Sequence, residues 1–260
     1  MTSETKTAKP TRPWQQVARE AQRHRDSTVD DIQPPLPAAL PHPLPKNVTA
    51  IPDQILSSRE LYITSLPVTA LLDALAGRHG DGRGGERLSA VEVTNAFLRR
   101  AALAQKLVNC LTELLPERAL DRARFLDEYF ERHGRPVGPL HGLPVSVKEH
   151  IGMKDLRLHG SYVAMWDNVA EENARVLQIL ENAGAVFHAR TTQPQTIMHL
   201  ETSSNLHGIT ENPFHRDLSA GGSSGGEGAL IGLGGSVLGI GSDVGGKLSP
   251  KLTLPESMRY

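Results

Sequence analysis

Apolar residues recur at helical spacing in two long segments of the first half of the chain. The first covers residues 89–107 and begins at Ser89, three residues before Glu92, which is the spacing of a capping box. The second begins at Pro116, a residue favoured in the first helical turn, and Gly134 ends it. The pattern therefore predicts two amphipathic helices that follow each other closely.

After the second helix the pattern changes to short apolar runs. Residues 143–148 and 185–189 predict two strands, and residues 176–183 between them predict a helix that ends at Gly184. Strand, helix and strand in this order favour parallel pairing within an α/β layer. A further short helix is predicted for residues 195–200.

The first 58 residues have a different character from the rest. Residues 14–25 have the spacing of a short helix. Prolines occupy six of the twelve positions from 34 to 45, which excludes a helix interior or a central strand there. Residues 1–58 are therefore predicted to form a helical and proline-rich N-terminal strap, and a helical pattern at residues 66–75 follows it.

Charge and cysteine content narrow the class of protein. The 28 Lys and Arg residues nearly balance the 29 Asp and Glu residues, so the net charge is −1, which argues against nucleic acid or a membrane surface as the partner. Cys110 is the single cysteine, which excludes an intramolecular disulfide framework and a multi-cysteine metal site. The polar N-terminus lacks the apolar core of a signal peptide, and we expect a cytoplasmic protein.

Glycines concentrate in two clusters, at residues 221–228 and 239–246. Backbone without Cβ atoms can turn tightly and direct several N–H groups at one anion or oxyanion. A flexible linker is disfavoured because apolar runs flank the first cluster. Residues 241–247 also meet the glycine and lysine part of a P-loop, although Leu248 stands where Ser or Thr would hold magnesium.

Several segments, taken in order, resemble the amidase signature family. They correspond to its lysine motif, an intervening segment, its serine-glycine motif and the residues that lead to its nucleophile, and the paired helices before them fit the fungal acetamidase-like branch. The resemblance implies an α/β fold with a mixed β-sheet core surrounded by α-helices, of which this chain would hold the N-terminal half. The matching segments are residues 138–149, 192–202, 212–213, 221–230 and 241–246.

The resemblance implies an amide hydrolase with a Ser, cis-Ser, Lys triad. Lys148 would be the base, and Ser223, whose peptide bond is cis in the family, would relay a proton between the base and the nucleophile. Considered alone, Lys148 is typical of a surface lysine and Ser223 of a turn, so the assignment depends on the motifs occurring together. The remaining implied positions line the substrate or supply backbone N–H groups to the oxyanion: Ile197, Val244, Gly245, Gly246 and residue 247.

The resemblance breaks at the nucleophile. The family's serine falls at position 247, where this chain has lysine, and Ser249 and Lys251 replace an arginine and a proline. Residues 59–246 are therefore predicted to be an incomplete, N-terminal part of an amidase signature domain, and residues 247–260 a tail foreign to the family. A retained or misassigned intron would explain such a junction.

The sequence thus predicts a protein of the amidase type that acts on a small-molecule amide and, as written, is an inactive fragment. No metal or organic cofactor is implied, and homodimerisation is left open for full-length relatives. Two alternatives remain. The first is a non-catalytic protein that holds an amide or carboxylate in the same glycine-rich pocket, and the second is a P-loop nucleotide binder.

Overall fold

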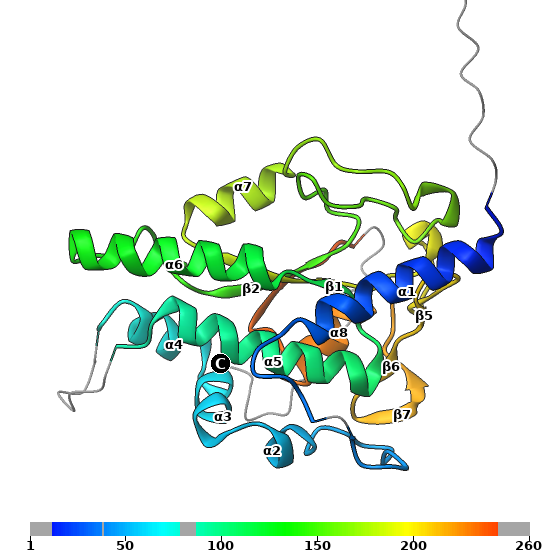
Figure 1. Ribbon diagram of the computed structural model, residues 1–260, viewed down its shortest axis with the longest axis horizontal. Helices are drawn as coiled ribbons and strands as arrows, with labels where there is room; N and C mark the ends of the chain where they lie inside the picture. Colours follow the sequence, from blue (N-terminus) through cyan, green and yellow to red (C-terminus); the bar gives the residue numbers. More distant parts are fainter. Residues whose placement is uncertain (1–11, 38, 79–86, 244–260) are drawn as a thin grey trace, which may run out of the picture.

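The computed structural model describes residues 12–37, 39–78 and 87–243, which form a mixed β-sheet with helices packed around it (Figure 1). This confirms the predicted fold class. The main sheet has the strand order β1-β3-β2-β8, in which β2 pairs in parallel with both β3 and β8, and β1 is antiparallel to β3. The strands of this sheet are β1 (Leu111–Leu114), β2 (Pro144–Lys148), β3 (Val186–Thr191) and β8 (Leu238–Ile240).

Two small ladders lie between β3 and the first glycine cluster. One pairs β4 with β5 and the other pairs β6 with β7, both antiparallel. Their bounds are β4 (Ser203–Ser204), β5 (Gly208–Ile209), β6 (Glu211–Asn212) and β7 (His215–Ser219).

The two long predicted helices are α5 (Ala90–Val108) and α6 (Pro116–His133), which lie side by side (Figure 1). The side chain of Ser89 accepts a hydrogen bond from the backbone N–H of Glu92, so the predicted N-cap is confirmed. The predicted capping box is only half formed, because the Glu92 carboxylate pairs with Arg59. Gly134 ends α6 with a φ of 65°, a conformation that suits glycine.

The N-terminal segment begins with α1 (Trp14–Asp30), which continues beyond the predicted residues 14–25 and packs against β1. The described residues between 34 and 45 form neither helix nor strand, as their prolines predict. Three short helices follow: α2 (Pro52–Ile55), α3 (Ser58–Ser65) and α4 (Val68–Leu75). The domain boundary between residues 58 and 59 stays a prediction.

The second half contains the remaining helical elements. The predicted helix at residues 176–183 is α7 (Arg175–Asn182), and the predicted helix at residues 195–200 is reduced to the short 3-10 turn η2 (Gln195–Ile197). Thr196 and Ile197 have positive φ angles of 69° and 61°, which an α-helix does not allow. The other elements are the 3-10 turn η1 (Val163–Met165) and the helix α8 (Gly225–Gly232).

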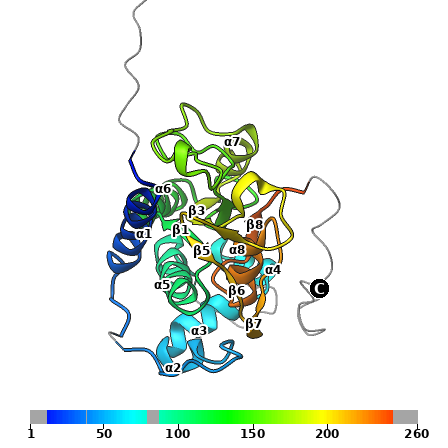
Figure 2. The ribbon, with the colours of Figure 1, turned by 90° about the vertical axis from the view of Figure 1, so that its right-hand side faces the viewer.

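Alternation along β2 separates the core from the polar residues. Val145 and Val147 are fully buried in the main apolar cluster, together with residues of α5, α6 and α7. Ser146 and Lys148 have the opposite orientation, towards α8, which lies beside β8 (Figure 2). A polar region is thus enclosed between the sheet and α8. Within the described part of the chain, no helix is both long and apolar enough to cross a membrane.

Candidate active site

The polar region lies at the carboxyl ends of the parallel strands. Lys148 is the last residue of β2, Ser242 follows β8 by two residues, and Ser223 and Ser224 directly precede α8. Open α/β sheets bind their ligands at this edge, because loops that follow adjacent parallel strands meet there. The fold therefore brings residues from three distant parts of the sequence to one point.

The ε-amino group of Lys148 is the centre of this region. Its Nζ atom lies 2.7 Å from Oγ of Ser223, 3.0 Å from Oγ of Ser242 and 3.1 Å from Oγ of Ser224. The side chain has no exposed surface. The peptide bond between Gly222 and Ser223 is cis, as the family resemblance implies. Lys148 is thus a buried amine that contacts three hydroxyl groups.

Burial also changes the acidity of this amine. Removal from water lowers the pKa of Lys148 from 10.5 to about 8, and the carboxylates of Glu227 and Asp243 partly oppose this change. A substantial fraction of the amine is therefore neutral slightly above neutral pH and can accept a proton from a hydroxyl group.

A buried acid, Glu227, lies on the same side of the sheet in the first turn of α8. Its carboxylate accepts hydrogen bonds from Oγ of Ser146, at 2.5 Å, and from Oγ1 of Thr191, at 2.8 Å. Burial raises the pKa of Glu227 to about 7. Gly239 in β8 leaves room for this carboxylate, since a Cβ atom at position 239 would collide with its Oε2 atom. Sequence reasoning missed Glu227, although an acid inside a glycine-rich motif was a signal.

Glu149, the residue after Lys148, fixes the backbone that follows β2 through hydrogen bonds to its carboxylate. Its carboxylate accepts hydrogen bonds from the backbone N–H groups of His159 at 2.7 Å and Gly160 at 3.0 Å, and from the side-chain amide of Gln193 at 2.6 Å. Burial raises its pKa to about 6. These contacts join the segment after β2 to the segment after β3 and so fix the backbone next to Lys148.

The structure brings together Lys148 and Ser223, two of the residues that the sequence singled out. Ser224 and Ser242 join them but were not predicted as site residues. Ile197 is half-buried in η2. The chain just after it packs against Gly222, where an added Cβ atom would lie 2.7 Å from the carbonyl oxygen of His199. The other predicted positions lie outside the described residues: Val244, Gly245, Gly246 and Lys247.

In the described ranges, no three His, Cys, Asp or Glu side chains are grouped so that they could hold a metal ion. His150, which lies near Lys148 in the sequence, instead hydrogen-bonds through Nδ1 to the side-chain oxygen of Gln193 at 2.8 Å. Burial lowers the pKa of His150.

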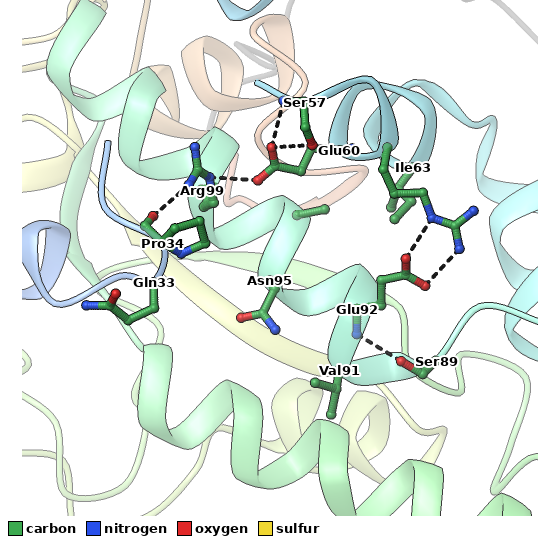
Figure 3. Close-up of a pocket in the computed structure, with 12 residues that line it drawn as sticks. Gln33, Pro34, Ser57, Glu60, Ile63, Ser89, Val91, Glu92, Asn95 and Arg99 are labelled. Atoms are coloured by element: carbon green, nitrogen blue, oxygen red, sulfur yellow. Dashed lines mark hydrogen bonds and ion pairs between the residues drawn. The ribbon is translucent and has the colours of Figure 1, made fainter. Parts of the chain in front are cut away.

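A separate cavity of about 400 Å³ lies between α3 and the start of α5 (Figure 3). Its charged side chains are paired with each other: Arg59 with Glu92, and Arg99 with Glu60, both at 2.7 Å. Lys148 does not line it. Because these charged groups are already paired with each other, the cavity is a weaker candidate for a catalytic site than the cluster around Lys148.

The chain is similar to known amidases over most of its length. The family model described as Amidase matches residues 92–247, more than half of the chain. An amidase of Gibberella moniliformis is 39% identical over 242 residues, which cover 90% of this chain and 44% of the relative. An acetamidase of Emericella nidulans is 48% identical over 195 residues, which cover 75% of this chain and 34% of the relative.

Solved structures show the same likeness. A fatty acid amide hydrolase superposes with a TM-score of 0.80 at 38% identity, over 90% of this chain and 41% of that one. The chain therefore spans 34–44% of the length of these three proteins.

Proposed function

The chain belongs to the amidase family, and on that premise we propose that its site is built to cleave the C–N bond of a small carboxamide. In this proposal Lys148 is the general base and Ser223 relays a proton between Lys148 and a nucleophile at position 247. The names of the relatives, which include acetamidases, support a small amide as the substrate. The single cysteine supports the cytoplasm as the place of action.

One observation carries this proposal, namely the buried Lys148 amine in contact with three hydroxyl groups. A hydroxyl group is a weak nucleophile until a base takes its proton, and a desolvated lysine is a suitable base. Ser223 has the shortest contact with Nζ, so it is the hydroxyl best placed to pass a proton on.

The second part of the proposal concerns the missing nucleophile at position 247. This chain has lysine where the family resemblance implies the nucleophilic serine. Loss of the nucleophile from a comparable serine hydrolase lowers turnover by about 10⁶-fold. We therefore propose that the chain retains the base and the relay but does not turn over amides.

Release of ammonia from acetamide tests both parts. We expect the unmodified chain to release ammonia at the background rate, and the Lys247→Ser variant to exceed background because it regains a hydroxyl at the nucleophile position. Adding Lys148→Ala to Lys247→Ser should return the rate to background. Turnover by the unmodified chain that disappears with Lys148→Ala would show that position 247 does not limit the activity.

A further inference from the structure

We propose that Ser223 is itself a nucleophile in this chain and takes the acyl group of an activated carboxylic ester onto its Oγ atom. The inference rests on the proposed role of Lys148 as a base, but it gives Ser223 a covalent role in place of the relay. It requires neither position 247 nor a nucleophile on another segment.

The contact between Ser223 and Lys148 supports this role. Oγ of Ser223 lies 2.7 Å from Nζ of Lys148, within the range in which a base takes a hydroxyl proton. The Lys148 side chain is fully buried, whereas Ser223 is partly exposed. Ser223 can therefore meet a ligand from solvent while its base stays shielded from water.

The other two hydroxyl groups at Lys148 are less suited to attack. Ser224 is 7% exposed, and its Oγ also hydrogen-bonds the backbone of Ser242, at 3.2 Å to the carbonyl oxygen and 3.3 Å to the N–H. Ser242 lies farther from Nζ of Lys148 than Ser223 does, at 3.0 Å against 2.7 Å. Ser223 therefore has the shortest contact with the base, and its Oγ is not held by the backbone of Ser242 as that of Ser224 is.

The backbone around Ser223 leaves space on one side and holds the residue firmly on the other. A Cβ atom at Gly221 would have no neighbour within 4 Å, so that side is open. A Cβ atom at Gly222 would lie 2.7 Å from the carbonyl oxygen of His199 and 2.9 Å from the carbonyl carbon of Leu200. The backbone that carries Ser223 is therefore tightly packed on one side, while the other side is open to a ligand. A hydroxyl group fixed in this way is preorganised for attack.

The acylation step balances without any further reactant. Oγ of Ser223 forms a bond to the acyl carbon while its proton moves to Nζ of Lys148. The bond from the acyl carbon to the leaving oxygen then breaks, and an aryl oxide leaves with the electron pair. Such a leaving group needs no proton, whereas an amine does, so the chain can react with an activated ester without hydrolysing amides. The lowered pKa of Lys148, about 8, supplies the neutral amine.

p-Nitrophenyl acetate is the probe that tests this inference. We expect a burst of p-nitrophenolate close to one equivalent per chain, and peptide mapping should place the acetyl group on Ser223. The burst rate should rise about tenfold between pH 7 and pH 9, as a base with a pKa near 8 loses its proton. Lys148→Met should slow acetylation of Ser223 about 10²–10⁴-fold, the usual contribution of a general base.

Ser65→Ala is the matched control, because Ser65 is an exposed serine on α3 whose loss should leave the burst unchanged. Mapping on the unmodified chain needs no variant, so a folding defect in Ser223→Ala cannot obscure the result. A burst that maps to Ser224, Ser242 or lysine side chains overturns the inference, and so does the lack of a burst. Acetamide turnover by Lys247→Ser without acetylation of Ser223 would leave the proposed function standing and remove only this inference.

Discussion

Replacing Arg190 with leucine should lower the free energy of unfolding by about 3–5 kcal/mol, the usual cost of breaking a buried ion pair. The Arg190 side chain is fully buried in β3, and its Nη1 atom lies 2.7 Å from the Glu113 carboxylate and 2.7 Å from the carbonyl oxygen of Arg157. Its Nη2 atom donates to the carbonyl oxygen of Glu149 and lies 3.7 Å from the carboxylate of the same residue. Without Arg190, two buried carboxylates lose their common cation.

The size of this effect should depend on pH. Burial alone would raise the pKa of Glu113, but the hydrogen bond with His24 and the charge of Arg190 lower it. In the Arg190→Leu variant the Glu113 and Glu149 carboxyls take up protons more readily, so the deficit should be smaller at pH 5 than at pH 8. Urea unfolding at the two pH values measures this difference.

Arg59→Leu is the control for this experiment. Arg59 pairs with Glu92 at 2.7 Å, but both side chains are more than one third exposed, and such pairs contribute about 0–1 kcal/mol. Equal losses for Arg190→Leu and Arg59→Leu would contradict a buried ionic network beneath the site.

The sequence predicted those parts of the fold that depend on local signals. Helix α6 begins at Pro116 and ends at His133, directly before Gly134, and both boundaries follow from backbone preferences of single residues. Strand β1 was missed, because four residues that are all buried have no alternation to reveal them. Helix α3 was missed as well, although Ser57 and Glu60 form a complete capping box there.

The candidate site likewise contains residues that the sequence predicted and residues that only the structure showed. Lys148 and Ser223 were found because they belong to motifs that resemble a known family. Ser242 and Glu227 also lie within two of those motifs. However, Ser242 reaches Lys148, and Glu227 reaches Ser146 of β2, only in the folded sheet, where β2 pairs with β8. Such pairing joins residues about 90 positions apart, and periodicity along the chain carries no information about it.

Glu227 should make the stability of this protein depend on pH in a direction unusual for a carboxylate. Burial raises its pKa in the folded state to about 7, against an ordinary value of 4.5. Between pH 4.5 and 7 the folded protein therefore holds a proton that the unfolded chain releases. The contribution of Glu227 to the free energy of unfolding is complete below pH 4.5 and is lost as the pH rises through 7. The difference between these pKa values corresponds to about 3 kcal/mol.

The Glu227→Gln variant isolates this contribution, because glutamine has the shape of the protonated acid and no proton to lose. Ser146 and Thr191 can still hydrogen-bond its amide, since a hydroxyl group can rotate to accept as well as donate. We expect the unfolding free energy of Glu227→Gln, relative to the unmodified chain, to rise by about 3 kcal/mol between pH 4.5 and pH 8.5. Groups common to both proteins largely cancel in this difference, and Glu201→Gln, at an exposed position, should change stability little at either pH. A difference that stays constant with pH would mean that folding does not raise the pKa of Glu227, which would contradict a protonated Glu227 in the folded protein between pH 4.5 and 7.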